Sequence, residues 1–220
     1  MTYTGEVVVG GPSDTREIDG LIVTKIAVGP MNNNAYLLRC ASTGQGLLID
    51  AANEPGRLIE MIGEVPVGTI VTTHQHYDHW QALPELAKQT GATLVAHPAD
   101  ADELPVEVGH RAENGEVLTF GDAAVSLVHL RGHTPGSLAV LYDAGGRLAS
   151  SPHVFTGDSL FPGGVGKTSS PENFTSLLND VTERLFDPLP NATWVYPGHG
   201  HDTTLGAERP QLPEWRARGW

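Results

Sequence analysis

One octapeptide dominates this sequence: Thr73-His74-Gln75-His76-Tyr77-Asp78-His79-Trp80. Its first residue, Thr73, ends the run 69–73, which predicts a buried strand. Its last residues lead into a segment with helical spacing. In an extended segment residues i and i+2 share a face, so His74 and His76 are predicted to point the same way. Two imidazoles on one face are suitable ligands for a borderline metal ion such as zinc. Asp78 and His79 fall where the chain turns into the helix, and this geometry suits two adjacent metal ions better than one.

Four residues cannot complete two coordination shells, so further ligands are expected from glycine-containing turns beside other strands. Three turns qualify: Gly132-His133-Thr134-Pro135-Gly136-Ser137, Phe155-Thr156-Gly157-Asp158-Ser159 and Tyr196-Pro197-Gly198-His199-Gly200. Each one alone is typical of ordinary turn chemistry. Together with the octapeptide they supply seven candidate metal ligands: His74, His76, Asp78, His79, His133, Asp158 and His199.

The motifs H-x-H-x-D-H, G-H-T-P-G-S, T-G-D-S-L-F and P-G-H-G occur in this order over residues 74–200. This pattern, with the apolar segments 34–38 and 47–50 before it, resembles the metallo-β-lactamase superfamily and, within it, the glyoxalase II-type (hydroxyacylglutathione hydrolase-like) hydrolases. The resemblance implies an α+β fold, a four-layer αββα sandwich with the metal site at one edge of its two sheets. It also implies the ligand sets: His74, His76 and His133 for one metal, Asp78, His79 and His199 for the second, and Asp158 as the bridge.

The resemblance gives these ligands a chemical purpose. Two cations about 3.5–4 Å apart share a water molecule and lower its pKa toward neutrality. The bridging hydroxide is expected to attack the carbonyl of a thioester, ester or lactone, while a metal ion stabilises the oxyanion. Asp78 is expected also to orient the hydroxide or accept its proton, which makes it the candidate catalytic residue. The expected cofactors are two divalent metal ions, with zinc first and with iron or manganese also suited to five imidazoles and two carboxylates.

Other members of the superfamily narrow the activity. As the resemblance implies, true β-lactamases of this fold usually lack an aspartate bridge, so Asp158 favours the thioester hydrolase and lactonase branches. His76 disfavours the diiron flavoprotein relatives, which carry a carboxylate there. A thioesterase is slightly favoured over a lactonase, because the segments 132–137 and 156–161 look more like glyoxalase II. The main alternative is a mononuclear iron persulfide dioxygenase with His74, His133 and Asp158 around the iron; a metal-binding protein without catalysis is a further alternative.

Lys167 is the candidate substrate-binding residue, and two sequence patterns bear on its role. The segment 163–168 superficially resembles a phosphate-binding loop, but that motif needs a glycine where Phe161 stands. In glyoxalase II relatives a basic residue after a similar Gly-x-Gly contacts the carboxylate tail of the substrate. Lys167 matches that position, so it is either a substrate-binding residue or a solvated lysine.

The composition excludes several classes of protein. The 220 residues include 13 Lys and Arg against 26 Asp and Glu, a formal net charge of −13 that disfavours a nucleic-acid partner. The single cysteine, Cys40, rules out an internal disulfide. The N-terminal segment lacks the regions of a secretory signal, and no stretch approaches the roughly 18–20 apolar residues of a membrane helix. We therefore expect a cytoplasmic protein that acts on a small molecule without membrane association.

No composition break divides the chain, so residues 1–220 are expected to form one domain without a separate C-terminal substrate domain. Glyoxalase II enzymes hold much of the glutathione on such a domain, and a thioester of another thiol therefore stays open. Trp80 stands where the family has small residues, and its ring is expected near the pocket. The tail, with Trp215 and Trp220, is expected to dock on the body of the protein; a homodimer contact is the alternative.

Short apolar or β-branched runs between Gly, Pro, Asn and Asp residues predict the strands. Their ranges are 5–9, 21–28, 35–39, 46–49, 69–73, 94–96, 116–120, 125–130, 138–142, 153–156 and 193–196. Helices are predicted over 55–62, 78–89 and 171–185. Asp78 is expected to cap the second helix and Gly91 to end it.

Overall fold

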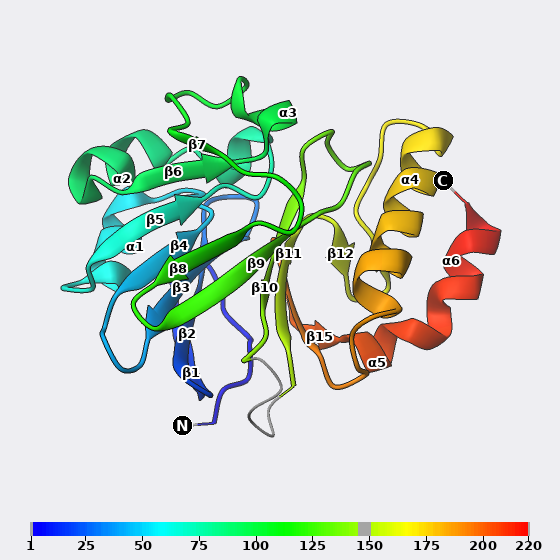
Figure 1. Cartoon of the computed structure of the whole chain (residues 1–220), viewed down its shortest axis with the longest axis horizontal. Coiled ribbons are helices and arrows are strands. Elements are labelled where there is room, and N and C mark those ends of the chain that lie inside the picture. Colours follow the sequence, from blue (N-terminus) through cyan, green and yellow to red (C-terminus); the bar gives the residue numbers. More distant parts are fainter. Residues whose placement is uncertain (1, 145–150, 220) are drawn as a thin grey trace.

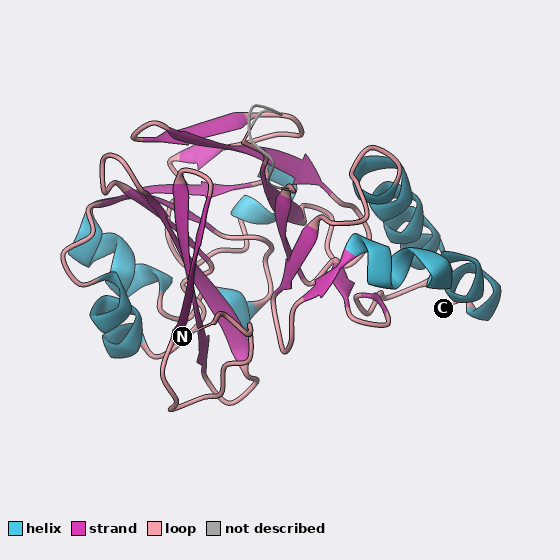
Figure 2. Cartoon of the chain, turned by 90° about the horizontal axis from the view of Figure 1, so that it is seen from below, coloured by secondary structure: helices cyan, strands magenta, loops and turns pink. Residues whose placement is uncertain are grey.

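The chain folds into four layers, and the computed structural model describes residues 2–144 and 151–219. Helices α1 (Pro55–Ile62) and α2 (Leu83–Thr90) pack on the outer face of one sheet. Helices α4 (Pro171–Val181) and α6 (Leu212–Arg218) pack on the outer face of the other. Figure 1 shows the first pair at the left and the second at the right, and Figure 2 shows the strands between them from below. The α+β, αββα sandwich that the sequence predicts is confirmed.

The first sheet has seven strands in chain order, β1 to β7. Their bounds are Asp14–Ile18, Leu21–Val28, Asn33–Cys40, Gly46–Ile49, Val67–Val71, Thr93–Ala96 and His110–Arg111. Strands β1 to β4 pair antiparallel, whereas β4 to β7 pair parallel. Parallel neighbours need crossover connections, which α1, α2 and α3 (Pro98–Ala101) supply.

The second sheet has six strands in the order β15-β14-β11-β10-β9-β8. Their bounds in that order are Thr203–Thr204, Trp194–Pro197, His153–Gly157, Leu138–Tyr142, Ala123–His129 and Val117–Phe120. Only β11 and β14 pair parallel among the described strands of this sheet. A small hairpin, β12 (Leu160–Phe161) and β13 (Gly164–Val165), follows β11, and a short helix, α5 (Leu205–Glu208), follows β15.

Aromatic rings join the inner faces of the two sheets. Phe155 and Tyr196 of the second sheet stack with ring centroids 4.4 Å apart, and the Tyr36 ring of β3 meets them edge-on at 5.1 and 5.6 Å. Tyr36 also donates a hydrogen bond of 2.6 Å to the carbonyl oxygen of Pro197, which satisfies its buried hydroxyl. This bond ties β3 to the end of β14, next to the turn that carries His199.

Two predictions about local structure are wrong. Residues 5–9 form no strand: Gly5 and Gly10 have positive φ angles of 73° and 80°, and the Val8 side chain is 66% exposed. The first strand is β1 instead, whose charged residues suit the edge of a sheet rather than a buried strand. Asp78 caps no α-helix, because it lies in a short 3₁₀ helix, Tyr77–His79, and α2 begins only at Leu83. Pro84 explains the late start, since its ring would clash with the preceding turn of a longer helix.

The C-terminal part departs less from expectation. Helix α4 ends at Val181 and continues as a π-helical turn over Thr182–Phe186, close to the predicted end at 185. Trp215 of α6 is 1% exposed, and its ring meets that of Phe186 at 6.4 Å, so docking of the tail is confirmed there. Trp220 lies outside the described residues. Within the described parts of the chain, no helix is long and apolar enough to cross a membrane.

Candidate metal centre

Four loops meet at one edge of the sandwich. Three of them follow the carboxyl ends of β5, β11 and β14, and the fourth connects β9 to β10. Backbone hydrogen bonds join these loops: Leu138 N donates to Thr73 O at 2.8 Å, and Gly198 N donates to Gly157 O at 2.8 Å. The edge therefore gathers side chains that are far apart in the sequence.

His74, His76 and His133 form the first group, here called the histidine cluster. His76 Nδ1 lies 2.9 Å from His133 Nε2, which lies 3.3 Å from His74 Nε2. His74 is buried and His76 is exposed, so the cluster reaches from the core to the surface. Tetrahedral zinc with bonds of about 2.0–2.1 Å holds its ligand nitrogens about 3.3 Å apart, and these spacings therefore suit one metal ion.

Asp78, His79 and His199 form the second group, here called the mixed cluster. The Nε2 atoms of the two histidines are 3.3 Å apart. Asp78 Oδ2 lies 3.3 Å from His199 Nε2 and 3.6 Å from His79 Nε2. Two imidazoles and one carboxylate likewise suit a divalent cation.

Asp158 lies between the two clusters. Its Oδ1 is 3.3 Å from His79 Nε2, and its Oδ2 is 3.5 Å from His199 Nε2 and 3.6 Å from His133 Nε2. Oδ1 is buried and accepts no hydrogen bond from any described residue, which is costly for a carboxylate unless a cation compensates it. The structure thus brings all seven candidate ligands together, and their donor set fits divalent metal ions.

The outward-facing ring nitrogens of four histidines each contact a group outside the clusters. The pairs are His74 Nδ1 with Thr73 Oγ1 at 3.0 Å, His79 Nδ1 with Asp50 Oδ2 at 2.8 Å, His133 Nδ1 with Lys167 O at 2.7 Å and His199 Nδ1 with Met31 O at 2.9 Å. Such contacts fix ring orientation and leave each Nε2 facing the clusters. His76 differs, because its Nδ1 faces inward. Lys167 contributes its backbone carbonyl here, and its exposed side chain stays only a predicted substrate contact.

Sequence reasoning missed Asp50 and Asn33, two buried residues that hold ligands in place. Asp50 accepts hydrogen bonds from Thr73 N at 2.7 Å and Thr73 Oγ1 at 2.8 Å, besides its contact with His79. Asn33 Nδ2 donates to Asp78 Oδ2 at 2.8 Å. The available signal for Asp50 was a carboxylate directly after the apolar run 46–49, where a buried strand ends.

Asp100, also missed, links the two loops that carry the histidine cluster. It is fully buried and accepts hydrogen bonds from Gln75 N at 2.9 Å, Thr134 Oγ1 at 2.6 Å and Gly136 N at 2.7 Å. Gln75 belongs to the octapeptide, and the other two donors belong to the His133 turn. No local pattern marks Asp100, because its partners are 25 to 36 residues away along the chain.

Glycine is required at position 198 by close packing. A Cβ atom there would lie 2.2 Å from Asp158 Oδ1 and 2.8 Å from His79 Cε1. The turn before His199 therefore passes directly against Asp158 and the mixed cluster, and any side chain would displace candidate ligands.

The electrostatics of the site favour ionised carboxylates. Burial alone would raise the pKa of Asp158, but the imidazoles of His199 and His79 beside it hold that pKa well below its usual range. Burial also opposes charge on His79, yet Asp50 and Asp158 raise the pKa of this imidazole to about 10. Burial lowers the pKa of His74 well below its ordinary value. Protonated imidazoles thus balance the carboxylates in the protein itself, and metal binding would release those protons.

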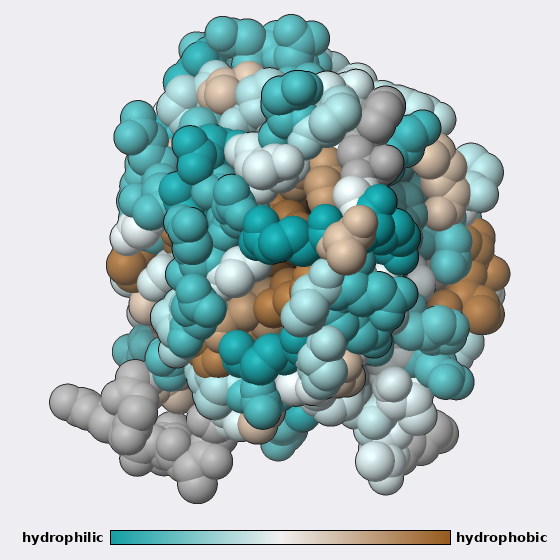
Figure 3. Space-filling view, turned by 90° about the vertical axis from the view of Figure 1, so that its right-hand side faces the viewer, coloured by the Kyte–Doolittle hydropathy of each residue, from teal (hydrophilic) through white to brown (hydrophobic). Residues whose placement is uncertain are grey.

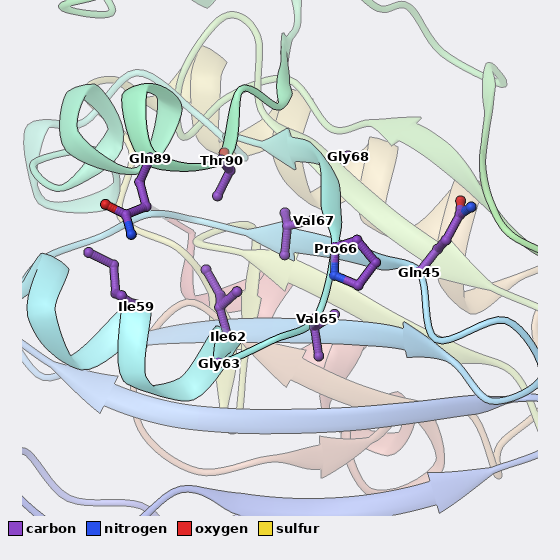
Figure 4. A pocket seen from close by; sticks show the side chains of 10 residues that line it. All are labelled: Gln45, Ile59, Ile62, Gly63, Val65, Pro66, Val67, Gly68, Gln89 and Thr90. Atoms are coloured by element: carbon purple, nitrogen blue, oxygen red, sulfur yellow. The ribbon is translucent and has the colours of Figure 1, made fainter.

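Two cavities differ in their relation to the clusters. A cavity of about 470 Å³ has His76 and His133 in its wall. Another, of about 480 Å³ and shown in Figure 4, is lined by Ile59, Ile62 and other residues that include no histidine, cysteine or carboxylate. It adjoins the amino ends of β4 and β5, at the opposite edge of the sheet from the clusters. Trp80 donates Nε1–H to Gln75 O at 2.7 Å and lines neither cavity.

Comparisons with known proteins point to one family. A sequence profile of the metallo-beta-lactamase superfamily matches residues 28–201, which include both clusters. The probable metallo-hydrolase YqgX of Bacillus subtilis is 30% identical over 210 residues, or 86% of this chain and 95% of that protein. A hydroxyacylglutathione hydrolase of Fuscovulum blasticum is 31% identical over 77% of this chain, which spans only 63% of that relative. The solved structure of TTHA1623 in a di-iron-bound form is 30% identical, with a TM-score of 0.69 over 87% of this chain and 99% of that one.

Proposed function

Because the chain belongs to the metallo-β-lactamase superfamily, we propose that it is a hydrolase that uses two divalent metal ions to cleave a thioester or a related ester or lactone. One observation carries the proposal: two adjacent clusters of metal-ligating side chains lie on either side of one shared carboxylate, Asp158. The ligands would be His74, His76 and His133 for one ion, Asp78, His79 and His199 for the other, and Asp158 for both.

The relatives support the finer parts of this proposal. Similarity to a hydroxyacylglutathione hydrolase favours a thioester as the substrate. The di-iron-bound form of TTHA1623 favours two ions in a site of this kind. We propose zinc as the native metal, with iron or manganese as alternatives, because imidazole and carboxylate ligands suit all three.

Bound divalent ions would lower the pKa of water and polarise the carbonyl group of the substrate. The protein itself supplies placement and a proton acceptor. Asp78 Oδ2 is held by Asn33 Nδ2 at 2.8 Å and faces the imidazole of His199. Asp78 Oδ1 is therefore the atom proposed to accept a proton from the attacking water. Lys167, fixed beside the histidine cluster through its backbone, is proposed as a substrate contact.

Metal analysis combined with hydrolysis assays tests the proposed function. We expect two metal ions per chain in the wild-type protein and hydrolysis of an S-acyl thiol, a simple lactone or both. Asp158→Ala should lower occupancy at both positions, because each ion loses a ligand. Full two-metal occupancy in that variant would contradict the shared carboxylate. One iron per chain without hydrolysis would favour the dioxygenase alternative.

A further inference from the structure

The cavity of about 470 Å³ beside the histidine cluster has the size of a small-molecule site, for which about 300–1,000 Å³ is typical. His76 and His133 form one part of its wall, so a molecule inside it touches the candidate metal centre. The lining also includes Ser169, from the loop before α4, and Asn173 and Ser176, from α4 itself. This wall belongs to the side of the molecule that carries α4, whose surface is largely hydrophilic (Figure 3).

The lining of this cavity differs in charge from the chain as a whole. None of the described residues that line it is Asp or Glu, although the chain has 26 of them against 13 Lys and Arg. Three other surface cavities each have one arginine and at least one carboxylate in their walls. Their walls include Glu60 in one, Glu17 and Asp19 in another, and Asp102 and Glu107 in the third. The cavity of Figure 4 has neither an acidic nor a basic residue among the described residues that line it. Of these five cavities, the one beside the histidine cluster alone combines an arginine with no carboxylate among its described lining residues.

Arg131 brings a permanent positive charge to the wall. Its Nε donates to Asp180 Oδ2 at 2.8 Å and its Nη2 to Asp180 Oδ1 at 2.7 Å. This pairing uses one edge of the guanidinium and leaves three of its five N–H groups available. The Arg131 side chain is 54% exposed, whereas that of Asp180 is 3% exposed, so the available N–H groups lie on the accessible side. Arg184 Nη2 also lies 3.6 Å from Asp180 Oδ1, and one buried carboxylate is therefore shared by two guanidiniums.

Hydroxyl and amide groups complete the wall. Asn173 Nδ2 donates to Ser169 Oγ at 2.9 Å, which leaves the Ser169 hydroxyl proton free to donate. Ser176 follows Asn173 by three residues on α4 and therefore lies on the same helix face. A guanidinium with neighbouring O–H and N–H donors matches a carboxylate, which is planar and only accepts hydrogen bonds.

We infer that this cavity binds a carboxylate-bearing end of the substrate, with Arg131 as the charged contact. The inference rests on the proposed function. It narrows the proposed substrates to thioesters or esters with a carboxylate on the part of the molecule that lies in this cavity, next to His76 and His133. A cationic group would be repelled by Arg131, and a neutral group would form weaker hydrogen bonds than a carboxylate with its three available N–H groups. Lys167 does not line this cavity, so its proposed contact with the substrate is a separate one.

The test places a charge in the wall while both Arg131 and Asp180 are kept. Ser176 is changed to Asp and to Lys, with Ser176→Asn as an uncharged control of comparable size. The substrates are an S-acyl thiol with a free carboxylate and its methyl ester, assayed with the metal-loaded protein. For the carboxylate substrate, KM should rise about fivefold in Ser176→Asp and fall by a similar factor in Ser176→Lys. For the methyl ester, KM should change less than about twofold in either variant.

Binding is measured separately by calorimetry with thioether analogues of the carboxylate compound and of its primary amide, neither of which contains an ester or thioester bond. The Kd values should shift in opposite directions for Asp and Lys, and only for the carboxylate analogue. Charge-dependent binding without hydrolysis of any ester would contradict the proposed function and still support the carboxylate site. Hydrolysis of both substrates with no opposite shifts, or with equal shifts for charged and neutral compounds, would overturn the carboxylate site alone.

Discussion

Asp50 Oδ2 lies 2.8 Å from His79 Nδ1, and the same carboxylate accepts two hydrogen bonds from Thr73. Asp50 follows β4, and both partners follow its parallel neighbour β5, so the ends of two strands are joined through one side chain. The carboxylate fixes the His79 ring with Nε2 toward the mixed cluster. Its role is therefore to position a candidate ligand rather than to be one.

Asp50→Asn should weaken metal binding without unfolding the protein. The amide keeps the size of the side chain, and Asn tolerates the φ angle of 57° at this position. With one acceptor oxygen instead of two, it cannot serve both Thr73 and His79. We expect metal affinity to fall by about 10–100-fold, measured by competition with a chelator. Asp122→Asn, at an exposed carboxylate bonded to Ser42, is the control and should leave the affinity unchanged.

Asp78→Asn separates proton transfer from metal binding. The substitution keeps one ligating oxygen but removes the charge and the proton acceptor. We expect kcat to fall by roughly two to four orders of magnitude with KM little altered, as for the loss of a general base. Hydrolysis of an S-acyl thiol and metal content are measured on the same preparation. A variant with two metal ions and near-normal kcat would show that Asp78 is only a ligand.

Lys25→Met should destabilise the fold and the loop of His199 together. The fully buried Lys25 Nζ donates to Gly5 O at 2.8 Å, to Gly200 O at 2.8 Å and to Asp202 Oδ1 at 2.7 Å. Its removal leaves a buried carboxylate without its cation, which costs about 3–5 kcal/mol. We expect that loss in the free energy of unfolding, measured with urea, together with reduced metal occupancy.

The matched control for this change is Lys88→Met, at an exposed position of α2. It should alter the free energy of unfolding by less than about 0.5 kcal/mol. A Lys25→Met protein as stable as this control would refute the anchoring role of Lys25.

His153→Asn should weaken the dependence of stability on pH. Burial, reinforced by Arg16, lowers the pKa of His153 to about 4, whereas an unfolded histidine has a pKa of about 6.5. Between these values the unfolded chain binds a proton that the folded protein does not, so stability falls as the pH drops through this window. From pH 7 to pH 5 the wild type should lose about 2 kcal/mol more than the variant.

The measurement for His153 is urea unfolding of both proteins at the two pH values. Asn supplies an oxygen that can replace His153 Nδ1, 3.0 Å from the Tyr196 hydroxyl, so the buried phenol keeps a partner. Identical pH dependence in wild type and variant would mean that His153 titrates normally in the folded protein.

Local patterns determined much of this protein from the sequence alone. The octapeptide and the three glycine turns revealed all seven candidate ligands, because each occurs in a short motif next to an apolar strand. The strands β2, β4 and β10 and the helix α1 also have their predicted bounds, since apolar runs or helical spacing end there at Gly, Pro, Asn or Asp. The order of motifs was sufficient for the family and the sandwich fold.

Only the tertiary structure decided which groups hold those ligands. Asn33 meets Asp78 across 45 residues, Met31 meets His199 across 168, and Lys25 meets Asp202 across 177. The bounds of α2 show the same limit, because Asp78 looked like a local cap while its carboxylate is held by a distant asparagine. A buried hydrogen bond depends on which strands become neighbours, and a single sequence contains no local signal of that pairing. The ligands could therefore be found from sequence motifs, whereas their supports appear only when β3, β4, β5 and β14 meet at one edge.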